Sequence, residues 1–158
     1  MTRIPVNQKA FKEQYRATFF YNRTFALIHW GVIISFVIVK AVMRPLVLES
    51  NSLELLQIFV LSYPNFCEAI IGSFVLVVMV KFINEQWLNK KYRISDKGTN
   101  IISLSLAAIY VITQELKLHN LGGQNVYDPF DILFSLIGLL IAYLLLMYVI
   151  PPKYGQTR

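Results

Sequence analysis

Four long apolar runs constrain this chain more than any other feature of its sequence. Their approximate bounds are 24–42, 64–83, 99–116 and 129–150. Each is close to the roughly 20 residues that a helix needs to cross the hydrocarbon layer of a bilayer. Because backbone polar groups in lipid must be satisfied internally, and because these runs do not alternate polar and apolar side chains, they predict helices rather than a β-barrel.

The composition agrees with a chain that is solvated by lipid. Hydrophobic residues make up 56% of the 158 residues and charged residues 15%, whereas soluble domains carry about 45–50% apolar and roughly 25% charged residues. The charges are also clustered between the apolar runs. The sequence therefore predicts an all-α membrane protein, with residues 1–158 forming a single transmembrane domain built as a bundle of four transmembrane helices.

Two further segments are amphipathic. Residues 6–21 mix basic side chains with aromatic ones such as Phe11 and Phe19 at helical spacing, which predicts an N-terminal interfacial helix on the cytoplasmic leaflet. Residues 52–62 are too few to span the membrane. They predict a short outer-face helix, or a partly re-entrant one, that ends at Pro64.

The distribution of Lys and Arg predicts the orientation. Eleven of the fifteen lie in the N-terminal lead, in the loop between the second and third runs, or in the tail, whereas only Lys40, Arg44 and Lys117 lie on the other side. Since cytoplasmic segments collect Lys and Arg, both termini are expected in the cytoplasm and residues 117–128 outside. Membrane orientation thus accounts for the net charge of +6, and no nucleic-acid partner is expected.

Ionisable residues inside the predicted helices mark a candidate site. Glu68, Glu115 and Asp131 each fall about one turn from the outer end of a helix, and Lys40 falls at a similar depth on the first helix. Charged groups inside a membrane are costly, which favours a functional interpretation. The alternative is that these side chains extend to the outer headgroups without a function.

The ends of the third and fourth helices carry the densest polar cluster. Gln114 and Glu115 end the third helix, while Asp131, Ser135 and Gly138 follow an i, i+4, i+7 spacing that places them on one face of the fourth. The chain is therefore predicted to contain an outward-facing polar cavity. Its candidate binding residues are Glu115, Asp131, Ser135, Glu68, Gln114 and Lys40.

Catalytic residues are left unassigned, although a carboxylate pair such as Glu115 and Asp131 could serve as acid and base. Both are expected at the same depth on neighbouring antiparallel helices, within about 10 Å of each other. No metal site and no cofactor are expected. Glu115 and His119 are separated by the expected end of the helix, and Cys67 is the chain's only cysteine.

Pairs of small residues four positions apart predict where the helices contact one another. The pairs lie on the second, third and fourth helices; they are Ala69 with Ser73, Ser103 with Ala107, and Gly138 with Ala142.

Residues 64–148 resemble the VanZ-like family of small bacterial membrane proteins. Gln114–Glu115 is similar to the acidic pair that ends one helix in that family, with Gln in place of its first member. Asp131, Ser135 and Gly138 match the family's D-x-x-x-N-x-x-G motif, with Ser in place of Asn, and the loop between lacks the Arg often found there. The resemblance implies the bacterial cytoplasmic membrane and a role like that of the namesake, which accompanies glycopeptide-resistance genes.

Two functions follow from these observations. The first is a VanZ-like membrane protein whose outward cavity engages a lipid-linked or envelope-derived group, with membrane lipid as its partner. The second is a non-enzymatic accessory subunit that docks a larger membrane protein or a second copy of the chain through its small-residue faces and its outer helix. A transporter is a weaker third alternative, since the chain is short and shows no inverted repeat. Whether the protein is an enzyme remains open.

Overall fold

The computed structural model describes residues 23–50, 52–115 and 129–149, and within these ranges all regular structure is helical. The elements are α2 (Arg23–Ile38), the π-helical turn η1 (Val39–Met43), α3 (Arg44–Glu49), α4 (Glu54–Gln86), the short 3₁₀ turn η2 (Lys90–Tyr92), α5 (Asp96–Glu115), α6 (Pro129–Leu144) and the π-helical turn η3 (Leu145–Val149). The predicted interfacial helix over 6–21 lies outside the described residues.

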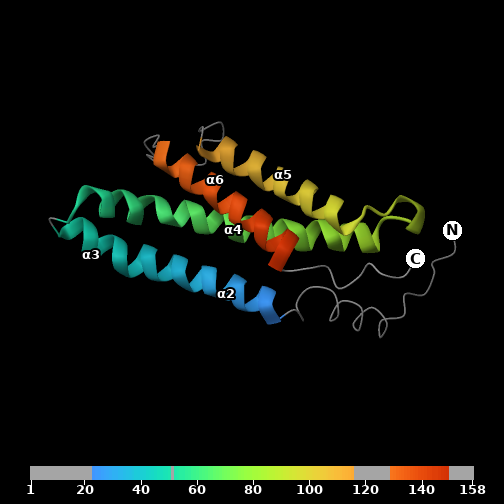
Figure 1. Ribbon diagram of the computed structural model, residues 1–158, viewed down its shortest axis with the longest axis horizontal. Helices are drawn as coiled ribbons and strands as arrows, with labels where there is room; N and C mark the ends of the chain where they lie inside the picture. The colour runs from blue at the N-terminus through green and yellow to red at the C-terminus, as the bar shows by residue number, and fades with distance from the viewer. Residues whose placement is uncertain (1–22, 51, 116–128, 150–158) are drawn as a thin grey trace.

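The long helix α4 is the centre of the arrangement. The rod formed by α2, η1 and α3 packs along one side of α4, while α5 and α6 pack on it from the other side and against each other (Figure 1). Figure 1 also shows that α6 runs in the same direction as α4, whereas α2 and α5 run in the opposite direction. The ends of α2, α5 and α6 are therefore positioned by α4.

Three helical segments are long and apolar enough to cross a membrane: Arg23–Glu49 with 27 residues, Glu54–Gln86 with 33 and Pro129–Val149 with 21. This supports the prediction of an all-α membrane protein. The third predicted run, 99–116, is also helical and forms the 20-residue α5. The described residues of α5 are not among the three segments that are apolar enough to cross a membrane. The four-span prediction is thus supported for three of its four helices.

The first predicted run was too short. Instead of ending near residue 42, the rod continues through η1 and α3 to Glu49. The Arg44 N–H donates to the Val39 carbonyl five residues earlier, which widens one turn without breaking the helix. Pro45 follows directly after this wide turn and does not break the rod.

The prediction of a separate short helix over 52–62 was wrong. Glu54–Gln86 is a single helix with Pro64 buried inside it. A proline in a helix removes one backbone hydrogen bond, here the one to the Val60 carbonyl, and membrane helices tolerate this where neighbouring helices support the segment. Val60 and Cys67, on either side of Pro64, are fully buried, so packing stabilises both halves.

The small-residue pairs lie where the helices meet, as predicted. All six residues are buried; they are Ala69, Ser73, Ser103, Ala107, Gly138 and Ala142. Gly138 also contacts the backbone of α4 directly. Larger side chains complete the core around them. Phe25 from α2, Phe74 from α4 and Leu146 from η3 belong to one cluster, so the two sides of α4 share a common core.

Candidate functional site

Lys40 and Glu68 form an ion pair between η1 and α4. The Lys40 Nζ lies 3.7 Å from the Glu68 Oε1. Both residues belong to helices apolar enough to cross a membrane, and the sequence had placed both in the candidate cavity. The wide turn of η1 changes the angular position of the residues that follow Ile38, which is how π-turns commonly present a functional side chain.

The direction of the two helices explains how these side chains meet. Helical side chains tilt toward the N-terminus of their own helix. Because the Lys40 rod and α4 run in opposite directions (Figure 1), the two side chains tilt in opposite directions along the helix axes, and their charged ends meet. They remain 50% and 43% exposed, so the pair lies at an edge that other molecules can reach. The Lys40 ammonium also lies over the Phe36 ring, 4.8 Å from its centroid.

A second polar group extends this seam between α2 and α4. The Tyr63 hydroxyl lies 3.2 Å from the Ser35 hydroxyl, which itself donates to the Val32 carbonyl at 2.9 Å. The Cys67 Sγ lies 3.8 Å from the same Ser35 Oγ. Sequence reasoning did not select Ser35 or Tyr63, although a serine and a tyrosine inside apolar runs were a visible signal.

The polar stripe on α6 lies on a different seam. Asp131 is partly buried in the first turn of α6, and Ser135 is 2% exposed. A Cβ at Gly138 would meet the Phe66 carbonyl and the Ala69 Cβ of α4, so this stripe faces α4. Ser135 and Gly138 thus lie between α6 and α4, whereas the Lys40–Glu68 pair lies between η1 and α4.

Gln114 and Glu115 lie at the end of α5. Gln114 is exposed, and Glu115 is the last residue of the helix. The end of α5 and the beginning of α6 lie at the same end of the molecule (Figure 1), and the two helices pack against each other. The Glu115 side chain is outside the description, so its distance to Asp131 stays a prediction.

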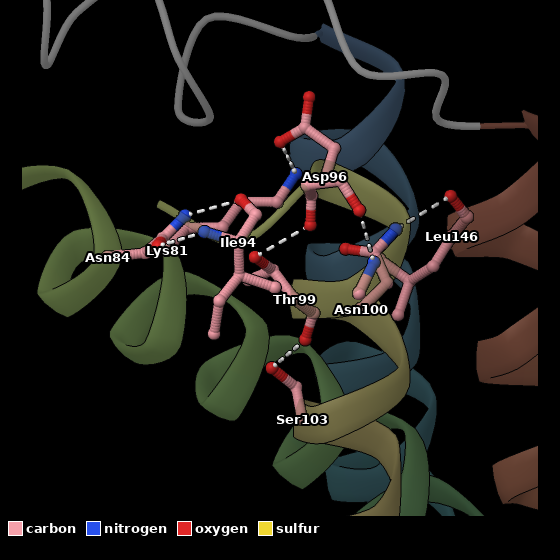
Figure 2. Close-up of polar contacts among 10 residues, drawn as sticks. Lys81, Asn84, Ile94, Asp96, Thr99, Asn100, Ser103 and Leu146 are labelled. Atoms are coloured by element: carbon pink, nitrogen blue, oxygen red, sulfur yellow. Dashed lines mark hydrogen bonds and ion pairs between the residues drawn. The ribbon is translucent and has the colours of Figure 1, made fainter. Parts of the chain in front are cut away.

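A further polar set lies at the opposite end of α4 and α5 and was missed by sequence reasoning. Figure 2 shows Asn84 facing the connection between these helices, where its amide donates to the Ile94 carbonyl and accepts from the Ile94 N–H, both at 2.9 Å. Lys81 and Asp96 form an ion pair at 3.5 Å beside it. These contacts hold the α4–α5 connection against α4.

Three polar residues in the first half of α5, Thr99, Asn100 and Ser103, are buried against the other helices. Asn100 is 3% exposed and donates to the Leu146 carbonyl of η3 at 3.4 Å. Ser103 is fully buried and donates to the Thr99 carbonyl at 2.8 Å, with the Leu76 carbonyl of α4 at 3.4 Å (Figure 2). The spacing of Thr99, Asn100 and Ser103 on an otherwise apolar helix was the signal for this face.

In the described part of the chain, no three His, Cys, Asp or Glu side chains are grouped so that they could hold a metal ion. Comparison of the chain with protein-family models, with curated proteins and with solved structures finds no match.

Proposed function

We propose that the chain is a VanZ-like integral membrane protein of the bacterial cytoplasmic membrane that binds an anionic group of a lipid-linked or envelope-derived molecule at its outward half. The Lys40–Glu68 ion pair carries the proposal, because it places two charges on helices that are otherwise apolar enough for lipid. Such charges are costly in a bilayer and are commonly retained for a function.

The chemistry of the pair favours an anionic ligand. The Lys40 ammonium has three hydrogen-bond donors, and in the protein alone Glu68 neutralises it at the edge of the α2–α4 seam. A phosphate that approaches along this exposed edge can take the place of the carboxylate beside Lys40. Arg44, one turn further along the same rod, supplies a second cation near the same ligand.

The orientation comes from the Lys and Arg distribution, which assigns Lys40 and Arg44 to the outward half with both termini in the cytoplasm. In this proposal α5 is the fourth span. Its length suits a bilayer of about 30 Å, and the burial of Asn100 and Ser103 means that it can cross without presenting these polar groups to lipid.

An accessory subunit is the second candidate, and one observation counts against it. The small-residue faces, one of the two surfaces on which docking was expected, are already buried between helices of this chain, as Ser103, Ala107 and Ala142 illustrate. A partner would have to use another surface. No catalytic role forms part of the proposal.

Native mass spectrometry of the protein in nanodiscs tests it. The nanodiscs contain phosphatidylcholine with a small fraction of a polyprenyl phosphate as probe, and the proteins compared are wild type, Lys40→Gln and the control Lys91→Gln. Lys91 is an exposed lysine in η2, at the other end of α4. We expect the polyprenyl phosphate to be bound to wild type and to Lys91→Gln with similar occupancy, and to Lys40→Gln with several-fold lower occupancy. Equal occupancy on all three would refute the proposal, and a stoichiometric copurifying protein would favour the subunit.

A further inference from the structure

Two buried serine hydroxyls lie on the seam between α4 and α6. Ser62 is fully buried and Ser135 is 2% exposed. Among the residues that the structure describes, neither hydroxyl has a hydrogen-bond partner. Buried polar groups in proteins are nearly always paired, so two unpaired hydroxyls on one seam require an explanation.

Other hydroxyls of this protein show how such groups are ordinarily satisfied. Ser73, Thr99 and Ser103 each donate to the carbonyl four residues earlier, at 2.7, 3.1 and 2.8 Å. This local bond is the usual one for Ser and Thr inside a helix. Ser62 and Ser135 also lie inside helices but do not make it.

The helix contacts place the two serines opposite each other. Gly138 on α6 lies against Phe66 on α4, and the two helices run in the same direction (Figure 1). Ser62 lies one turn before Phe66, and Ser135 lies one turn before Gly138, so both serines are at the same level. The Phe59 and Phe134 rings, with centroids 5.8 Å apart, contact each other nearer the start of both helices and confirm this alignment.

We propose that Ser62 and Ser135 together bind one uncharged hydroxyl group between α4 and α6, supplied by a water molecule or by a lipid headgroup. A hydroxyl can donate to one serine oxygen and accept from the other. Phe59 and Phe134 bound the site on one side, and the close contact at Gly138 bounds it on the other. These two contacts require the bound group to be small.

The site is on the α4–α6 seam, whereas the proposed anion site is on the α2–α4 seam, so either proposal can fail without the other. The two serines either bind a hydroxyl between them or are simply unsatisfied, and these two interpretations predict opposite effects of alanine substitutions on stability. If a hydroxyl bridges them, removing one serine oxygen leaves the bridge and the other serine unsatisfied, which destabilises the protein. If nothing is bound, each alanine removes an unsatisfied buried group and stabilises it.

The test is thermal unfolding of Ser62→Ala, Ser135→Ala and the double variant in detergent micelles. We expect each single variant to lower the midpoint by about 2–4 °C, and the double variant to lower it by clearly less than the sum of the two. Single variants that raise the midpoint, or losses that simply add, both in micelles alone and after lipid is added, would overturn the proposal. Ser73→Ala is the matched control, because Ser73 is equally buried but already has its own partner; its effect should add to that of Ser135→Ala.

Repeating the cycle with added lipid identifies the source of the hydroxyl. Phosphatidylglycerol carries free hydroxyls in its headgroup, and phosphatidylcholine carries none. Equal coupling between the two serines in micelles alone and with either lipid assigns the site to water. Coupling that appears only with phosphatidylglycerol assigns it to the lipid headgroup. Absence of coupling under all three conditions overturns the site itself.

Discussion

Gly138 of α6 lies against the backbone carbonyl of Phe66 on α4. A Cβ added at position 138 would come within 2.5 Å of that oxygen and 3.0 Å of the Ala69 Cβ. The opposing atom is backbone, so no change of rotamer can relieve the contact. Gly138 therefore determines how closely α4 and α6 approach, and with this the geometry of the Ser62–Ser135 site one turn away.

Gly138→Ala should destabilise the protein. The added methyl group forces the two helices apart, and overpacking of this kind typically costs about 1–3 kcal/mol. The measurement is the thermal midpoint in detergent. Gly72→Ala on α4 is the control, because a Cβ there meets nothing within 4 Å and alanine is favoured over glycine in a helix by roughly 0.5–1 kcal/mol. Equal effects of the two substitutions would contradict the close approach at Gly138.

The Lys40–Glu68 pair should behave as a unit. Glu68→Leu alone leaves the Lys40 ammonium without its counter-ion on an apolar helix, and Lys40→Met alone does the same to the carboxylate, so both should lower the yield of folded protein several-fold. The double variant leaves no lone charge and should recover most of that yield. Fluorescence-detected size exclusion of the detergent extract measures it. If the double variant lowers the yield of folded protein by as much as the two single variants combined, the two residues act separately.

The Asn84 contact should hold the α4–α5 connection in place. Asn84→Ala removes both hydrogen bonds to Ile94 and leaves the Ile94 N–H without this acceptor, at a cost of about 1–3 kcal/mol. The expected result is faster proteolytic cleavage between Trp87 and Ser95. Asn84→Asp keeps the acceptor oxygen and should be cleaved at an intermediate rate. Cleavage at the wild-type rate in both variants would refute this role.

The proposed orientation predicts which exposed positions a membrane-impermeant thiol reagent can label in intact cells. Leu53, at the turn before α4, is 79% exposed, and Asn89 is exposed in the α4–α5 connection. Leu53→Cys should be labelled from outside and Asn89→Cys only after the membrane is opened. The native Cys67 is fully buried, so the background should be low. The reverse pattern would overturn the orientation.

The apolar runs predicted the helices well but not their boundaries. The expectation that Pro64 separates two helices came from a local rule about the missing proline N–H, and the packing around Val60 and Cys67 overrides that rule. The rod formed by α2, η1 and α3 continues to Glu49 through the wide turn η1, and no residue pattern in the sequence predicted this turn.

Residue type and depth were enough to select Lys40, Glu68 and Ser135 as candidates, but not to pair them. The sequence pattern does not single out Ser62, because a single serine in an apolar run is common. It becomes informative only when its hydroxyl is found buried opposite Ser135 without a partner.

The sequence by itself determined that this chain is helical and suited to a membrane, because the length of an apolar run and the placement of Lys and Arg are properties of local segments. Only the tertiary structure decided that Lys40 meets Glu68, that Gly138 meets Phe66, and that Phe59 meets Phe134. These relationships depend on the direction, rotation and spacing of helices whose contacting residues lie far apart in the chain, and side-chain packing alone sets those quantities.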